Sequence, residues 1–246
     1  MKNKLVIFQS LIQRFCIFIY CFSTFFMLPS SSYADLAFDN KTRFIMKKKR
    51  MPIIIQNLTE NETLVLATLD QPNNISDNIP VTLNTPIIKL DPNSKKSIDI
   101  LYKGFGLPLD RESFFILSIQ EIPKKIENEN SIKFALNHKF KLFYRPNFII
   151  KYNQSNALQW IKDDKNSKIK IKNLSPYYIT LSRVKDGNNK CNFMIEHMMI
   201  SPFSDSELNL KCETDYIRYS LVTDEGNYLP YQVNIKSNIN IPFQSE

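Results

Sequence analysis

The side chains that most often carry out chemistry in proteins are sparse in this sequence. Its two histidines, His138 and His197, would each have to serve an imidazole-based mechanism alone. His138 lies in an alternating apolar and polar stretch, and His197 stands beside Met198 and Met199, which favours packing or surface roles. Without a cluster of histidines and cysteines there is no transition-metal signature.

Other motifs also lack a catalytic partner. Gly104-Phe105-Gly106 has neither the lysine nor the helical continuation of a phosphate-binding loop, so it predicts a turn. Asp163-Asp164 stands among polar residues, which is typical of a solvated loop. The basic run Lys47–Arg50 is compatible with a docking patch, but a charged turn between two strands is favoured. We therefore predict a protein that is not an enzyme and needs no metal or cofactor.

The first 34 residues have the order of a secretory signal peptide. Two early lysines precede an apolar stretch, Phe15–Leu28, and small residues lead to Ala34. A transmembrane anchor is the alternative, but Gln13 and Arg14 interrupt the apolar run and the remainder is short for a bilayer. We expect residues 1–34 to be cleaved and the rest to be exported.

Cleavage would leave 212 of the 246 residues, enough for two domains of about 100 residues each. The segment removed carries three cations and no acid, so the formal charge falls from +8 to +5. This modest charge on an exported chain gives no basis for a nucleic-acid partner.

Two cysteines, Cys191 and Cys212, remain after cleavage. In an oxidising compartment such a pair favours one disulfide, which would close a loop of about 20 residues and contribute about 3 kcal/mol. Two separate buried thiols are the alternative.

The apolar pattern is that of strands. Apolar segments are short and alternate with polar residues, while prolines and asparagines punctuate the chain. Ile53–Ile55 predicts a buried strand, Ile98–Tyr102 a half-buried one, and Lys168–Lys172 an alternating one. Many short strands without a strand–helix repeat indicate antiparallel sandwiches. Because Pro146 ends a strand near the middle of the exported chain, we predict two sandwich domains, residues 35–146 and 147–246.

Residues 132–142 alternate most regularly, with apolar side chains on one face and mostly polar ones on the other. The pattern alone favours an ordinary sandwich strand with its apolar face on the core.

The residues that follow carry a family resemblance. The run Lys139–Pro146 and the segment Leu107–Ser113, which is followed by a strand and Ile122-Pro123, resemble the end of the first domain in the PapD-like periplasmic chaperones of the chaperone-usher pathway. The similarity extends over the exported chain. Further matches are Thr42–Ile45, Thr85-Pro86, Leu90–Pro92, Asn173, Ser175–Thr180, Pro202-Phe203 and Asp224. Departures from the family pattern are Ile116, Ser118 and Leu174.

The resemblance implies an all-β fold of two immunoglobulin-like sandwiches set at an angle, and a role in the periplasm. Such a chaperone binds and caps fimbrial subunits by donor-strand complementation and delivers them to an outer-membrane usher. It implies that Arg43 and Lys141 bind the subunit's C-terminal carboxylate in the cleft between domains. The implied donor strand contains Ile132, Phe134, Leu136, His138 and Phe140, and the side chains expected to fill the subunit's groove are Ile132, Phe134 and Leu136.

Three further implications concern structure. Glu112, Arg145 and Asp224 match positions of an ion network that links the domains, with generic surface charge as the alternative for Asp224. The proline of Thr85-Pro86 permits a cis peptide bond at Pro86. Self-association of the subunit-free chaperone is left open.

One rival hypothesis comes from a different class. A secreted two-domain adhesive or binding module would use the alternating strand simply as core. A polar substitution such as Phe134→Asp would then unfold the first domain, whereas the chaperone hypothesis expects a folded protein that binds its subunit poorly.

Overall fold

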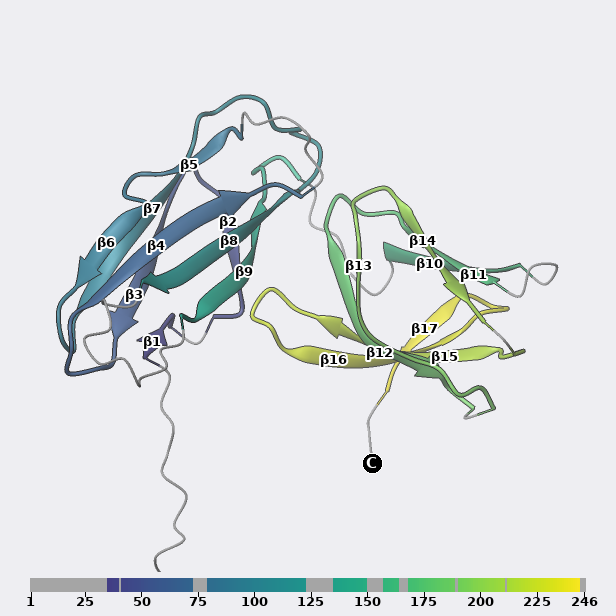
Figure 1. Ribbon diagram of the computed structural model, residues 1–246. Coiled ribbons are helices and arrows are strands. Elements are labelled where there is room, and N and C mark those ends of the chain that lie inside the picture. The colour runs from purple at the N-terminus through teal and green to yellow at the C-terminus, as the bar shows by residue number, and fades with distance from the viewer. Residues whose placement is uncertain are drawn as a thin grey trace, which may run out of the picture. The chain divides into compact units, whose positions relative to one another are not determined.

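The computed structural model describes residues 35–39, 41–72, 79–122, 135–149, 157–163, 168–188, 190–210 and 212–243 (Figure 1). The predicted signal segment, Ile132 and Phe134 therefore lie outside the described residues. The described parts form strands β1 to β17 and no α-helix. Within these ranges, no helix has the length and apolar character needed to cross a membrane.

The first half of the chain forms a sandwich of two sheets. One sheet has the strand order β1 (Leu36–Ala37), β3 (Arg50–Asn57), β7 (Lys95–Tyr102), β5 (Val81–Leu83). The other has the order β2 (Arg43–Met46), β9 (Asn137–Tyr144), β8 (Ser113–Ile122), β4 (Thr63–Asp70), β6 (Ile87–Leu90).

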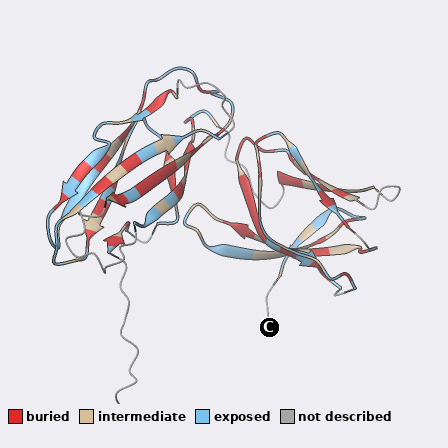
Figure 2. Ribbon diagram, in the orientation of Figure 1, coloured by how far each residue is buried: buried red, intermediate tan, exposed pale blue. Residues whose placement is uncertain are grey.

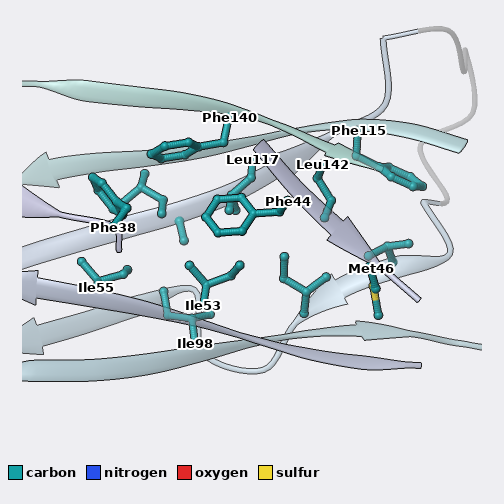
Figure 3. Close-up of a cluster of buried hydrophobic side chains, with 14 of the residues drawn as sticks. Phe38, Phe44, Met46, Ile53, Ile55, Ile98, Phe115, Leu117, Phe140 and Leu142 are labelled. Carbon is teal, nitrogen blue, oxygen red and sulfur yellow. The ribbon is translucent and has the colours of Figure 1, made fainter. Parts of the chain in front are cut away.

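Alternate side chains from the two sheets meet in the core of this first sandwich (Figure 3). Buried and exposed residues accordingly alternate along its strands (Figure 2). In β8, Phe115, Leu117 and Ile119 are buried because every second residue of a strand points to the same face. Ile53 and Ile55 of β3 face them from the other sheet. Burial of each such side chain contributes about 1.5–3 kcal/mol.

The strand Ile53–Ile55 differs from its prediction. Ile54 is 42% exposed, since it points away from the core while its two neighbours point inward. Three consecutive apolar residues therefore do not show that both faces of this strand are buried. The half-buried strand predicted at Ile98–Tyr102 and the alternating strand at Lys168–Lys172 are confirmed as parts of β7 and β11.

The N-terminal segment changes sheets between Ala37 and Arg43. Strand β1 pairs with β3 in the four-stranded sheet, whereas β2 pairs with β9 in the five-stranded sheet. The pairing of β2 with β9 is parallel, and every other strand pairing among the described residues is antiparallel.

The second half forms another sandwich. Its three-stranded sheet has the order β10 (Leu158–Asp163), β11 (Lys168–Asn173), β14 (Asp205–Asn209). Its five-stranded sheet has the order β13 (Met194–Ile200), β12 (Ile179–Asp186), β15 (Tyr216–Val222), β16 (Tyr228–Asn234), β17 (Ile239–Pro242). Trp160, Ile171, Leu181 and Tyr219 lie in the core between these sheets. The prediction of an all-β protein with two sandwiches is thus confirmed, and Pro146 falls between the last strand of one and the first of the other.

A disulfide and a buried acid hold the C-terminal end of β12. Cys191 and Cys212 are joined, with 5.8 Å between their Cα atoms. The carboxylate of Asp186 accepts hydrogen bonds from the backbone N–H groups of Asn188 and Cys191 and from the Thr214 hydroxyl. Burial alone would raise the pKa of Asp186, but these hydrogen bonds lower it below the ordinary aspartate value.

Two turn predictions have different outcomes. Gly104 and Gly106 both have positive φ, at 91° and 82°, so the turn predicted there is confirmed. No cis peptide bond occurs among the described residues, so the cis prediction at Pro86 is wrong. The Pro86 carbonyl accepts a hydrogen bond from the Ala67 N–H at 2.7 Å, which keeps the chain extended into β6, and the trans form is the favoured one even before proline.

Candidate functional site

Strand β9 is paired on both sides over only half of its length. Residues 141–144 lie between β8 and β2. Residues 137–140 pair with β8 on one side, and no described strand pairs with them on the other. This half of β9, residues 137–140, is called the open edge below. Its backbone offers N–H and C=O groups to an added strand.

The side chains of the predicted donor strand divide into two groups. Leu136, just before the open edge, is 45% exposed. Phe140 is only 9% exposed, and its ring centroid lies 4.8 Å from that of Phe38 and 5.3 Å from that of Phe44 (Figure 3). His138 is half-buried against Phe38.

Phe140 was predicted as part of the donor strand but not as a side chain that enters the subunit, and its side chain is indeed unavailable to a partner. Its ring belongs to the core of its own sandwich, because strand alternation points it to the same face as Leu142. The structure therefore leaves Leu136 as the described apolar side chain that is free to enter a partner. Ile132 and Phe134, the other two donor residues predicted, are outside the described ranges.

Two cations stand where the open edge stops. Arg43, the first residue of β2, lies directly opposite Lys141 in the parallel ladder, and both are half-buried. Burial lowers the pKa of Lys141, and the nearby charge of Arg43 lowers it further. Burial also lowers the pKa of Arg43. Two desolvated like charges favour an anion beside them.

Arg145 joins the two other residues of the predicted ion network. Its Nε lies 2.6 Å from Glu112 Oε1, and its two terminal nitrogens lie 2.6 and 2.8 Å from the carboxylate oxygens of Asp224. The bidentate geometry is the strongest form of such a pair. Glu112 is almost fully buried, and this burial raises its pKa, although Arg145 and the Tyr178 N–H oppose the rise.

Both halves of the chain match domains of one known family. The model of the pili and flagellar-assembly chaperone family, PapD N-terminal domain, matches residues 39–149, and that of the pili assembly chaperone PapD, C-terminal domain, matches residues 153–233. The chain belongs to the PapD-like pilus-assembly chaperone family. The role of this family is assembly, which is not an enzymatic one.

Relatives of this chaperone support the assignment along most of the chain. The probable fimbrial chaperones YehC and YadV of Escherichia coli K12 are each 30% identical to it. The YehC match covers 76% of this chain and 82% of YehC, and the YadV match covers 84% and 92%.

Solved structures agree in fold. The crystal structure of the YadV chaperone is 25% identical, with a TM-score of 0.64, and the match covers 81% of this chain and 99% of YadV. The SafB chaperone, solved in complex with the Salmonella enterica pilin SafA, is 22% identical, with a TM-score of 0.69 over 83% of this chain and 98% of that one.

Two tyrosines of the chaperone complete the surroundings of the ion network. The Tyr178 N–H donates to Glu112 Oε2 at 2.8 Å, and the Arg145 guanidinium lies 4.8 Å from the centre of the Tyr177 ring. Sequence analysis included both tyrosines only within the matched segment Ser175–Thr180 and predicted no functional role for either. The signal that could have found them is their place beside Ser175-Pro176 in a segment that departs from strand alternation.

Further contacts link the start of β2 with the turn after β15. The Arg43 Nη1 lies 3.4 Å from the Val222 carbonyl oxygen, to which it donates. Gly226 has a φ of 90°, and a Cβ there would lie 2.5 Å from Thr42 Oγ1. Any larger residue at 226 would therefore push against Thr42, next to the Arg43–Lys141 pair.

The histidines stay apart from this site chemistry. Burial lowers the pKa of His138, whose Nε2 lies 3.9 Å from Glu121 Oε1, and His197 is exposed on β13. Among the described residues there is no group of three histidine, cysteine or acidic side chains that could hold a metal ion.

Proposed function

We propose that this chaperone acts in the periplasm, after cleavage of residues 1–34, and holds a fimbrial subunit at the open edge of β9. The subunit's last strand pairs with residues 137–140, and its C-terminal carboxylate binds Arg43 and Lys141. The complex then passes the subunit to an outer-membrane usher.

The observation that carries this proposal is where the open edge ends. Strand β2 begins at Arg43, opposite Lys141, and blocks the edge from there onward. An added strand must therefore stop at the two cations. If it runs parallel to β9, as β2 does, the end that arrives there is its C-terminus.

Electrostatics select this direction. An antiparallel strand would bring a positively charged N-terminal amine toward two cations, which is repulsive. A terminal carboxylate can instead accept charge-assisted hydrogen bonds from both side chains, worth about 1.5–3 kcal/mol each.

The apolar part of the interaction falls to the residues before the open edge. Strand addition takes its affinity from main-chain hydrogen bonds and its specificity from alternate side chains, and donor-strand complementation of pilins by chaperones is an established example of this mode. Leu136 is exposed in the position that such a mode requires. Ile132 and Phe134 are proposed to continue its face.

Co-expression with a fimbrial subunit in the periplasm tests the proposal. We expect Arg43→Gln and Lys141→Gln to fold normally but to lose the subunit on co-purification. Lys95→Gln is the matched control, because Lys95 is an exposed cation on β7 of the same sandwich. Full retention of the subunit by both site variants would refute the carboxylate site.

A second variant separates the chaperone from the secreted binding module. Leu136→Asp should leave the thermal unfolding midpoint unchanged, since the side chain is exposed, and should abolish subunit binding. Unfolding of the first sandwich by this substitution would favour the rival, in which the strand serves only as core.

A further inference from the structure

The second sandwich contains a hollow that is lined by none of the residues of the open edge. It lies on the five-stranded sheet and has a volume of about 370 Å³. Its lining includes Arg183, Lys185, Arg218, Tyr228, Pro230 and Phe243. These residues come from β12, β15, β16 and the residue after β17, so a large part of the sheet contributes to it (Figure 1).

A β-bulge in β12 shapes this hollow. Ser182 pairs with Ser220 and Lys185 with Arg218, so β12 has one more residue than β15 between these two pairs. Arg183, inside the bulge, has a φ of 52°, a conformation that is costly for a residue with a side chain. Bulges of this kind commonly redirect side chains near binding sites.

Aromatic rings orient two of the cations. The Arg218 guanidinium lies 4.4 Å from the centre of the Phe243 ring, and its Nε donates to Gln232 Oε1 at 2.9 Å. The Arg183 guanidinium lies 5.8 Å from the centre of the Tyr228 ring. Neither contact neutralises the positive charge.

The charges of the hollow are not balanced within the described part of the chain. Lys185 and Arg218 stand directly opposite each other on neighbouring strands, an arrangement that destabilises a sheet. No ion pair connects either of them, or Arg183, to a described carboxylate.

We propose that this hollow binds an acidic, extended segment of a partner protein, with carboxylates on Arg183, Lys185 and Arg218 and an apolar side chain against Tyr228 and Phe243. The site lies on the second sandwich, and none of its lining residues belongs to the open edge.

The geometry favours a peptide over a lipid surface. A membrane binds basic side chains that project outward together with apolar side chains that can insert. Here the guanidinium of Arg218 lies 4.4 Å from the centre of the Phe243 ring and that of Arg183 lies 5.8 Å from the centre of the Tyr228 ring, and all four residues line one hollow. Guanidinium forks match carboxylates in a bidentate way, and flat aromatic and proline walls suit the side chains of an extended segment.

Fluorescence anisotropy on the full exported chain tests the site. The probe is a short fluorescein-labelled peptide of alternating glutamate and phenylalanine, and its partner probe has glutamine in place of glutamate. We expect the acidic peptide to bind and the glutamine peptide to bind at least about tenfold more weakly. Equal binding of the two peptides, or no binding of the acidic one, would overturn the proposal.

Variants then assign the binding to the hollow. Lys185→Gln and Arg218→Gln should each weaken binding about tenfold, while Lys236→Gln, an exposed cation in the turn after β16, should not. Because Lys185 and Arg218 repel each other, the thermal midpoint of Lys185→Gln should be equal to that of the wild type or higher, which excludes loss by misfolding. Unchanged binding by both glutamine variants contradicts the proposal.

Competition distinguishes other anions. Neither phosphatidylglycerol vesicles nor inorganic phosphate should displace the acidic peptide at moderate ionic strength. Displacement by either one would identify a lipid or simple anion site in place of the proposed peptide site.

Discussion

Both sandwiches place two cations directly opposite each other on neighbouring strands, but in different surroundings. In the first, Arg43 and Lys141 are half-buried in a parallel pair where the open edge of β9 ends. In the second, Lys185 and Arg218 form an antiparallel pair inside a sheet that has strands on both sides of β12 and β15.

The difference shows what kind of ligand each pair can take. At the end of an open edge, a ligand can use backbone hydrogen bonds, and only its terminus reaches the cations. On the face of a sheet the backbone is already paired, so a ligand can use only side chains. The first pair therefore suits a chain end and the second suits acidic side chains within a chain.

The largest effect is expected for a substitution in the core beneath the open edge. Phe140→Ala should lower the free energy of unfolding by about 3–5 kcal/mol, because it removes a buried ring that packs on Phe38 and Phe44. Leu136→Ala should change it by less than about 0.5 kcal/mol. Urea denaturation of both variants checks this, and equal losses would show that the two residues do not differ in burial.

The next largest effect is expected at Asp186, which follows the bulge of β12 and the Lys185–Arg218 pair. Asp186→Asn should cost about 1–3 kcal/mol, because the hydrogen bonds to its carboxylate lose their charged acceptor. It should also weaken binding of the acidic peptide while leaving subunit binding intact. Denaturation and the two binding assays decide this.

The sign of the pH dependence follows from the lowered pKa of Asp186. The folded state favours the ionised form of Asp186. Its contribution to the free energy of unfolding is therefore present above the unfolded-state pKa and is lost as the pH falls through the folded-state pKa. The difference in stability between wild type and Asp186→Asn should therefore shrink in acid. A constant difference down to the acid limit would contradict this account.

A third prediction concerns Lys141 and alkaline pH. Carboxylate binding requires the protonated amine, and burial and Arg43 lower its pKa below the ordinary lysine value of 10.5. Affinity for a subunit should thus fall as the pH rises through this lowered pKa, before an ordinary lysine would lose its proton. Lys141→Arg should remove the fall, because arginine keeps its charge. Binding measured along an alkaline pH series gives the answer.

The smallest effect is expected for the stability of the chaperone without ligand, when one cation of the Arg43–Lys141 or Lys185–Arg218 pair is removed. Removing one of two opposed like charges, with Lys141→Gln or Lys185→Gln, should raise the unfolding free energy by about 0.2–1 kcal/mol at low salt. The gain from Lys185→Gln should shrink as salt screens the exposed Lys185. Chemical denaturation at two salt concentrations measures it, and a loss of stability in either variant would mean that its lysine supports the fold.

The sequence alone determined much of the fold and part of the site. Strand alternation and turn residues are local, so short segments such as Lys168–Lys172 could be assigned without tertiary information. The motifs around Arg43, Glu112, Lys141 and Arg145 identified the family, and the structure brings Glu112, Arg145 and Asp224 together as that resemblance implied.

What only the tertiary structure decided depends on pairing between distant segments. Alternation predicts that Leu136 and Phe140 lie on the same face. Phe38 and Phe44 pack on Phe140 and bury it, whereas Leu136 stays exposed. The point at which the open edge ends depends on where β2 pairs with β9. The basic hollow depends on the bulge in β12 and on Phe243, which comes from near the C-terminal end of the chain. Alternation within one strand gives the face on which a side chain lies, but which distant segment covers that face depends on contacts between segments, so the pattern of one strand could not give it.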